Sequence, residues 1–298
     1  MRSLDHGRDP VKRAMSEALN RYIESGYRKV DGWLSAMAIR STVTLGNLQK
    51  RLGIRGAVSE IGVHHGRLFI LLHLLTEPPE ISVAWDLFEF QNENADGSGH
   101  GDKHRFQTNL VRHGCDLNRV KINTVNSRTL TADKIIAECE SKVRIFSVDG
   151  AHSAATTFSD LHVAAASVCE GGLILLDDFF NADWPGVAEG ACRYLHQNQG
   201  SLFPVAIVGN KFIFTNTKAM AKIYVGALYN RNYGFGCRIK KSLVFGNETL
   251  TISPYGAPRG SLFDQTLDCV SNSRMWELLR YTAVGRFFKI LLRQIRDV

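Results

Sequence analysis

Residues 203–215 read Phe-Pro-Val-Ala-Ile-Val-Gly-Asn-Lys-Phe-Ile-Phe-Thr, two apolar runs on either side of Gly209-Asn210. Both runs have the length and the β-branched and aromatic side chains of strands. A two-residue connection can join only antiparallel neighbours. The sequence therefore predicts strands over 203–208 and 211–215 that form an antiparallel hairpin.

Upstream of this hairpin, from Gly56 to Leu176, short apolar runs alternate with longer helical patterns. This alternation is typical of βαβ units and a parallel sheet. The expected strands are Ala57–Ile61, Ile81–Leu87, Val120–Val125, Val143–Val148 and Leu173–Leu176. The expected helices lie around 68–75, 129–140 and 155–168. The predicted fold class is α/β and Rossmann-like, with a mostly parallel sheet and a terminal antiparallel hairpin.

The segment before the sheet has helical periodicity. Val11, Met15 and Leu19 recur at helical spacing, and a second helix is expected over 34–48, where Ser41-Thr-Val-Thr44 interrupts the pattern. We therefore divide the chain into an N-terminal helical segment (1–50), a central α/β domain (51–217) and a C-terminal extension (218–298).

The composition is that of a globular protein. The 298 residues carry 36 basic and 29 acidic side chains, and the resulting charge of +7 permits an acidic partner or a membrane surface without requiring one. None of the six cysteines forms a C-x-x-C pair, which argues against a zinc site and fits reduced thiols. Neither a signal peptide nor an apolar run of about 18 residues is found, so we expect a cytoplasmic protein.

The stretch Glu60-Ile-Gly-Val-His-His-Gly66 follows the first predicted strand and opens a helix. Gly62 permits a sharp turn, and Gly66 removes a side chain where a ligand would approach the backbone. Glu60 is placed to contact the amino acid moiety of a cofactor. Asp86, at the end of the second strand, is placed to bind ribose hydroxyls. The alternatives are an ordinary turn and a capping acid.

Three aspartates follow the fourth and fifth strands: Asp149 after one, Asp177 and Asp178 after the other. Parallel neighbours end at the same edge of a sheet, so the three carboxylates should converge and repel one another unless a cation compensates them. Oxygen ligands in this number suit Mg²⁺ or a similar ion. His152 could face the same cleft as a general base. A helix cap would explain one of these acids but not three, and His152 could instead cap or pack the next helix.

A polar, glycine-rich loop over 91–102 follows the second strand. Ligands bind at this edge of open α/β sheets, and loops of this length are often functional. The loop is expected to be either a mobile lid or an ordinary surface loop.

These motifs resemble the class I S-adenosylmethionine-dependent methyltransferases, in particular the family of macrocin and mycinamicin sugar O-methyltransferases, which has cephalosporin hydroxylase-like relatives. The resemblance covers about residues 55–215. Its most specific part is Asp149-Gly-Ala-His152 combined with Gly171–Val187. A parallel sheet that ends in an antiparallel hairpin is also typical of class I methyltransferases and not of dehydrogenase-type sheets.

The resemblance implies a metal bound by Asp149, Asp177 and Asp178, and a base at His152. It also implies S-adenosylmethionine over the glycine turn, beside Asp149, with Ser127 on its adenine side. The expected reaction is O-methyl transfer to a small polyhydroxylated acceptor, a sugar or a glycosylated natural product, aided by magnesium or a similar divalent cation.

Residues 274–298 are predicted to form an amphipathic helix. Val284, Phe288 and Leu292 lie along one side, and Arg286 and Arg293 lie largely on another. This helix could lie on a membrane surface, pack against the protein, or form the contact of a homo-oligomer.

Other functions remain as alternatives. A nucleic-acid methyltransferase is disfavoured because the D/N-P-P-Y-type motif is absent after the fourth strand, so no nucleic-acid partner is expected. A nicotinamide oxidoreductase is disfavoured by the glycine spacing. A metal-dependent hydroxylase is disfavoured because no 2-His-1-carboxylate set is evident. A non-catalytic binding member of the same fold stays open.

Overall fold

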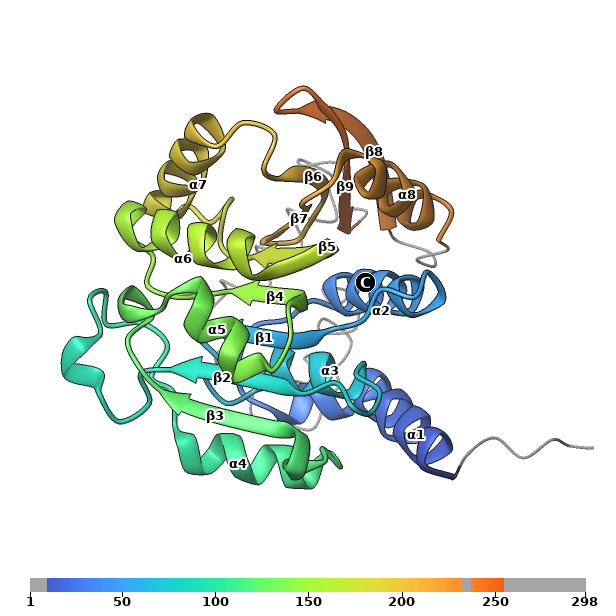
Figure 1. Cartoon of the computed structure of the whole chain (residues 1–298), viewed down its shortest axis with the longest axis vertical. Helices are drawn as coiled ribbons and strands as arrows, with labels where there is room; N and C mark the ends of the chain where they lie inside the picture. The colour runs from blue at the N-terminus through green and yellow to red at the C-terminus, as the bar shows by residue number, and fades with distance from the viewer. Residues whose placement is uncertain (1–9, 232–236, 255–298) are drawn as a thin grey trace, which may run out of the picture.

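The computed structural model describes residues 10–231 and 237–254, which form one mixed sheet with helices on both faces (Figure 1). The nine strands lie in the order β3-β2-β1-β4-β5-β7-β6-β9-β8. They are β1 Ala57–Ile61, β2 Ser82–Asp86, β3 Val120–Thr124, β4 Val143–Val148, β5 Val168–Leu176, β6 Phe203–Val208, β7 Lys211–Thr215, β8 Cys237–Val244 and β9 Asn247–Pro254. This order confirms the predicted α/β, Rossmann-like fold class.

The parallel part of the sheet consists of β1 to β5. β1 lies between β2 and β4, β3 flanks β2, and β5 flanks β4, all in parallel pairs. Every residue of β1, β2 and β4 is buried, because helices cover both faces of the sheet. Strands buried on both faces read as apolar runs, which is why the sequence pattern predicted them closely.

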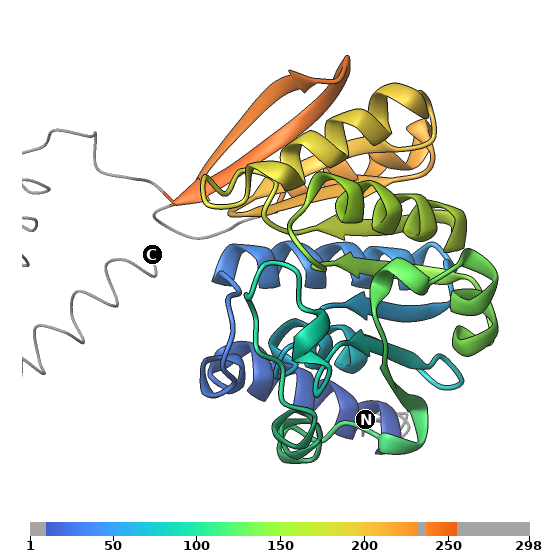
Figure 2. The same ribbon diagram turned by 90° about the vertical axis from the view of Figure 1, so that its left-hand side faces the viewer.

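The predicted hairpin is formed by β6 and β7, with Val208 opposite Lys211. β7 also pairs antiparallel with β5. The sheet continues beyond this hairpin, since β9 pairs parallel with β6 and β8 pairs antiparallel with β9. These last two strands were not predicted. They lie at one end of the long axis of the molecule, with α4 at the other (Figures 1 and 2).

The helices form two layers. α5, α6 and α7 pack in sequence on one face, where they share a core with β4 and β5. α2, α3 and α8 cover the other face, flanked by α1 and α4. The helices are α1 Pro10–Glu24, α2 Ala36–Arg51, α3 Arg67–Leu74, α4 Lys103–Arg112, α5 Ala132–Cys139, α6 Ala154–Ser167, α7 Pro185–Gln197 and α8 Lys218–Tyr229, with short 3₁₀ turns at Gly26–Lys29, Gln91–Glu93, Leu117–Arg119 and Ser127–Thr129.

Helix α2 runs through the stretch that the sequence analysis took as an interruption. Ser35 caps its start by accepting a hydrogen bond from the Ala38 amide at 3.1 Å. Within the helix, the Thr44 hydroxyl donates to the Arg40 carbonyl at 2.7 Å. Bonding back to the preceding turn lets a Ser/Thr-rich stretch remain helical.

A buried ion pair joins β4 to the segment before β2. The Arg144 guanidinium, fully buried, donates to Glu80 Oε1 at 2.8 Å and to Glu80 Oε2 at 3.2 Å. It also donates to Gln49 Oε1 at 3.1 Å and to the Leu75 carbonyl at 2.8 Å. This cluster holds the amino ends of the parallel strands, opposite the edge where the predicted site residues lie.

Several predictions fall outside the described residues. The amphipathic helix over 274–298, with its membrane or oligomer contact, is one of them.

None of the described helices is long and apolar enough to cross a membrane. The described cysteines, 115, 139, 169, 192 and 237, are unpaired. The cytoplasmic location stays a prediction.

Candidate active site

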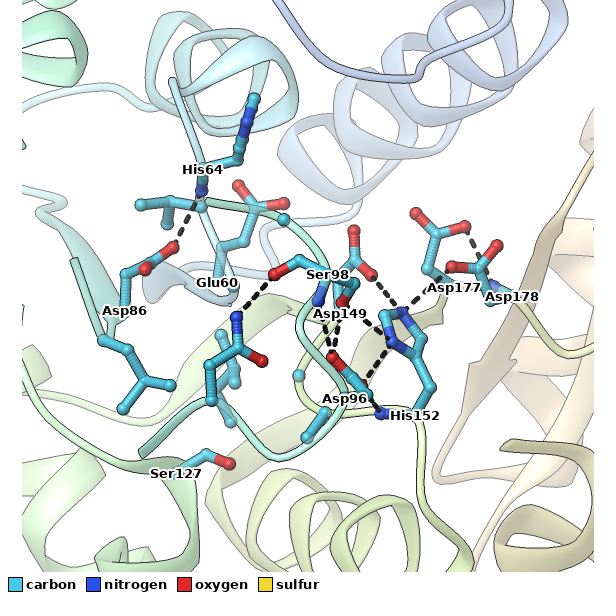
Figure 3. Close-up of a pocket in the computed structure, with 18 of the residues that line it drawn as sticks. Glu60, His64, Asp86, Asp96, Ser98, Ser127, Asp149, His152, Asp177 and Asp178 are labelled. Atoms are coloured by element: carbon cyan, nitrogen blue, oxygen red, sulfur yellow. Dashed lines mark hydrogen bonds and ion pairs between the residues drawn. The ribbon is translucent and has the colours of Figure 1, made fainter. Parts of the chain in front are cut away.

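The carboxyl ends of β1, β2, β4 and β5 open into a cavity of about 580 Å³. Its walls are completed by three loops: 31–33 before α2, 91–99 after β2, and 181–184 before α7. Cavities of this size hold small ligands and cofactors. Figure 3 shows the polar side chains that project into it.

Gly62 and Gly66 both adopt positive φ angles, +79° and +91°. A Cβ on Gly62 would lie 1.7 Å from the Asp149 carbonyl oxygen, so glycine lets the end of β1 lie against the end of β4. A Cβ on Gly66 would meet the Phe106 ring of α4 at 2.6 Å. Gly62 lines the cavity but Gly66 does not. The missing side chain of Gly66 makes room for α4, and contact of Gly66 with a cofactor stays a prediction.

Glu60 is the penultimate residue of the buried strand β1, and it lines the cavity with almost no solvent exposure. Its Oε2 atom has no hydrogen-bond partner. Burial raises the pKa of Glu60 to about 8. A buried, unpartnered carboxyl at the wall of a cavity is placed to receive a donor from a ligand.

Asp86 is the last residue of β2, and its carboxylate stabilises the glycine turn by hydrogen bonding. Its Oδ2 accepts a hydrogen bond from the His64 amide at 2.8 Å, and its Oδ1 accepts one from the Phe88 amide at 2.9 Å. Burial raises the pKa of Asp86, although these two amides oppose the rise. The carboxylate lines the cavity and can accept further hydrogen bonds, since each oxygen has two lone pairs.

Ser127 follows β3 and lines the cavity. Its hydroxyl donates to Asp160 Oδ2 on α6 at 3.2 Å. Burial raises the pKa of Asp160 to about 7. Ser127 is thus tied to the layer of helices beneath the cavity.

His152 lies between three carboxylates (Figure 3). Its Nδ1 is 2.8 Å from Asp96 Oδ2, and its Nε2 is 3.3 Å from Asp178 Oδ2 and 3.9 Å from Asp149 Oδ1. The ring stacks on Trp184 at a centroid distance of 4.3 Å. Partial burial lowers the pKa of His152, but the hydrogen bonds that its ring donates to Asp178 and Asp96 outweigh this effect and raise the pKa overall.

Among the described residues, Asp149, His152 and Asp178 form a group that could hold a metal ion. Their ligand atoms all lie within 4.8 Å of one another. Burial, and then the charge of Asp177, raise the pKa of Asp149 well above its ordinary value. Hydrogen bonds from His152, Asn181 and Asn210 outweigh the effect of burial on Asp178 and lower its pKa.

Asp177, the third predicted ligand, is outside this group. Its Oδ2 accepts a hydrogen bond from the ammonium of Lys211, and its Oδ1 accepts one from the Asp178 amide at 3.0 Å. Burial opposes the charge on Lys211, but Asp177 and Asp149 outweigh it and raise the pKa of the lysine. Asp177 and Lys211 are 4% and 2% exposed, so neither reaches solvent.

The comparisons with known proteins fit this geometry. Residues 59–179, which include β1 to β5, match a family model described as a methyltransferase domain. A search of curated proteins finds no match.

Several solved structures are similar to this chain. The O-methyltransferase NovP aligns with a TM-score of 0.56 at 12% identity, over 68% of this chain and all of NovP. CalS11, a TDP-rhamnose 3'-O-methyltransferase of calicheamicin biosynthesis, aligns with a TM-score of 0.45 at 15% identity, over 72% of this chain and 99% of its own. An O-methyltransferase from Bacillus cereus in complex with SAH aligns with a TM-score of 0.46 at 15% identity, over 72% and 94%.

The α/β fold brings most of the predicted residues to one cavity. The lining includes Glu60, Gly62, Asp86, Ser127, Asp149, His152, Asp177 and Asp178. Gly66 lies behind the turn, and Asp177 is turned toward Lys211.

The sequence analysis did not single out Asp96, Trp184, Asn210 or Lys211, all of which line this cavity. Asp96 belongs to the loop that was predicted as a lid, and it also accepts a hydrogen bond from the His152 amide at 2.8 Å. The polar composition indicated that the loop could serve the site. It did not indicate which acid would reach a histidine 56 residues away.

Proposed function

We propose that the protein is an S-adenosylmethionine-dependent O-methyltransferase that uses a divalent metal and acts on a small polyhydroxylated acceptor, a sugar or a glycosylated natural product. One observation carries this proposal: the Asp96–His152 pair stands beside Asp149 and Asp178 at the ligand-binding edge of a methyltransferase domain. A held imidazole next to two carboxylates suits removal of a proton from a hydroxyl near a cation.

The cofactor would lie across the ends of β1, β2 and β3. Glu60, whose Oε2 is unpartnered, would accept a hydrogen bond from the amino group of the methionine moiety. Asp86 would bind the ribose hydroxyls, and Ser127 would border the adenine. Gly62 has no side chain, so the cofactor could lie directly against the backbone of the turn. Asp149 would lie near the methyl group. These are the residues that the sequence predicted, with Gly66 acting through its packing on α4.

The residues present fit a divalent cation. Asp149 lines the cavity, and no described hydrogen-bond donor contacts its carboxylate. Burial, and after it the charge of Asp177, raise the pKa of Asp149. Asp149 and Asp178 would hold the ion, with Asp177 as the predicted third ligand. A bound divalent ion lowers the pKa of a coordinated hydroxyl and fixes its orientation.

The chain's own residues then handle the proton. Asp96 accepts the hydrogen bond of His152 Nδ1 and thereby leaves Nε2 as the basic nitrogen on the side of Asp149 and Asp178. His152 Nε2 would accept the proton of the acceptor hydroxyl as its oxygen attacks the sulfonium methyl carbon. Trp184, stacked on the imidazole, keeps the ring from turning and excludes water from one face.

The aromatic rim supports a sugar-like acceptor. Trp33 is 75% exposed and lines the cavity beside His64, and Trp184 lines it beside His152. Faces of aromatic rings pack against the apolar faces of sugars while the hydroxyls remain available to polar side chains. The acceptor would therefore lie between these two tryptophans.

Three measurements test the proposed function. Calorimetric titration should show binding of S-adenosylmethionine and none of NADH. Incubation with a panel of hydroxylated acceptors should add one methyl mass to a sugar. A chelator should abolish this transfer while cofactor binding persists. Full turnover after exhaustive metal removal would contradict the metal requirement, and NADH binding would contradict the enzyme class.

Replacing His152 by alanine should lower the transfer rate by ~10²–10⁴-fold, because the base is lost. The matched control is His162→Ala, which removes an exposed imidazole on α6. Equal rates for the two variants would remove His152 from the proposed mechanism.

The rival hydroxylase is not supported by the described residues. Their candidate metal group has one imidazole and two carboxylates, whereas non-haem iron oxygenases use two imidazoles and one carboxylate.

A further inference from the structure

The turn between β6 and β7 delivers two side chains to the active site. Asn210 lies in the turn, and Lys211 begins β7. Leu176 of β5 pairs antiparallel with Phe212 of β7, so the next positions outward, Asp177 and Lys211, face each other at the edge of the cavity. The pairing of these strands therefore places a lysine beside one of the acids that follow β5.

The Asp177–Lys211 pair is buried in the wall of the cavity. Both side chains are buried, with exposed fractions of 4% and 2%. Both oxygens of Asp177 are used, one by the Lys211 ammonium and one by the Asp178 amide at 3.0 Å. Removing one partner of a buried pair leaves an uncompensated charge, so an incoming ion cannot take Asp177 without stranding Lys211.

Asp178 is oriented differently from its neighbour. Its backbone has a positive φ of +57°. Its Oδ1 accepts hydrogen bonds from Asn181 at 3.1 Å and from Asn210 at 3.2 Å, while its Oδ2 faces His152. The same turn therefore holds both acids: Lys211 neutralises Asp177, and Asn210 aims Asp178 at the cavity.

We infer that Lys211 is a resident counter-ion of the active site, which withdraws Asp177 from the metal and leaves a site built on Asp149 and Asp178 beside His152. This inference rests on the metal of the proposed function and specifies its ligands. Lys211 acts through Asp177 and is a positioning residue. Its ammonium also adds a permanent positive charge next to the bound cation, so it weakens metal binding.

Metal affinity, measured without acceptor, tests this inference. The probe is Mn²⁺, titrated by electron paramagnetic resonance and calorimetry into the wild-type protein, Lys211→Met, the double variant Asp177→Asn/Lys211→Met, and Asp178→Asn. Lys211→Met should bind Mn²⁺ about tenfold more tightly or better, because it removes a repelling charge and frees Asp177. The double variant keeps the net charge and should return to within about threefold of the wild type.

Asp178→Asn should bind Mn²⁺ at least about tenfold more weakly than the wild type, because a ligand is lost. The matched control is Lys121→Met on β3, whose ion pair with Glu140 is at the surface, and it should leave the affinity unchanged. Thermal unfolding and titration with S-adenosylmethionine verify that each variant is folded.

Two results would overturn the inference. In one, Lys211→Met binds Mn²⁺ no more tightly than the wild type. In the other, the double variant binds as weakly as Asp178→Asn, which would make Asp177 a direct ligand. If Lys211→Met does not fold, the comparison of the double variant with Asp178→Asn still tests whether Asp177 is a metal ligand. A failure of the proposed function would instead appear as absent cofactor binding or absent methyl transfer, with the Mn²⁺ series unaffected.

Discussion

The contact between Gly62 and Asp149 leads to a prediction that links folding to the site. In Gly62→Ala, the new Cβ would lie 1.7 Å from the Asp149 carbonyl oxygen, where even tight contacts require 3.0 Å. The ends of β1 and β4 must therefore separate by more than ~1 Å, within the range in which misplaced catalytic groups cost about 10²-fold in rate. Asp149 and the neighbouring His152 would move with the end of β4.

The free energy of unfolding should fall for two separable reasons. A non-glycine residue at φ +79° costs roughly 1–2 kcal/mol, and overpacking a buried contact costs roughly 1–3 kcal/mol more. Gly53 provides the matched control. Its φ is +74°, and a Cβ there would meet nothing within 4 Å. Gly53→Ala should therefore lose only the first contribution and keep its activity.

Urea unfolding of the two variants measures the difference, provided that their m-values agree. Methyl transfer and Mn²⁺ affinity then report on the site. If Gly62→Ala unfolds within about 0.5 kcal/mol of Gly53→Ala, or transfers methyl groups at the wild-type rate, the close approach of β1 and β4 does not control the site as described.

Three further predictions concern other polar groups. Arg144→Met should lower the free energy of unfolding by ~3–5 kcal/mol in urea, because it strands a buried Glu80 carboxylate; a loss under about 1 kcal/mol would contradict this. Asp96→Asn should slow methyl transfer at least ~10-fold and move the acidic limb of the pH–rate profile to lower pH, since Asp96 helps to raise the pKa of His152 and the base works when neutral. An unchanged profile would count against this pairing. Burial lowers the pKa of His73 to about 4, so below pH 6.5 only the unfolded state gains its proton, and up to ~3 kcal/mol of stability should be lost between pH 6.5 and about 4. This slope should be absent from His73→Asn in urea titrations at each pH.

The sequence predicted the central parallel strands β1, β2 and β4 well because both of their faces are buried. The bounds of β1 and β4 agree with the prediction to the residue, since a strand covered on both sides must be apolar throughout. β8 was missed because its exposed positions carry Arg238, Lys240 and Lys241, which break the apolar pattern. A strand near the rim of a sheet has one covered face at most, and its sequence signal is correspondingly weak.

For the site, the sequence predicted which acids would gather but not how each would be paired. The carboxyl ends of parallel strands meet at one edge of the sheet, which is why Asp149, Asp177 and Asp178 were all expected together. Lys211 follows Asp177 by 34 residues, and only the register between β5 and β7 makes them partners. Asp96 reaches His152 through an irregular loop, whose path no periodicity encodes.

The place of β9 beside β6 sets a lower limit on the length of a usable fragment. A chain that stopped at Thr215 would retain every residue of the cavity described above. It would also leave the outer rim of β6 without its hydrogen-bonded neighbour and uncover the pocket that Leu250 and Ile252 fill, both of which are fully buried. Such a bare rim recruits strands from other molecules. We therefore expect a protein shortened to residues 1–215 to aggregate or form fibres, even though no residue of the cavity has been removed.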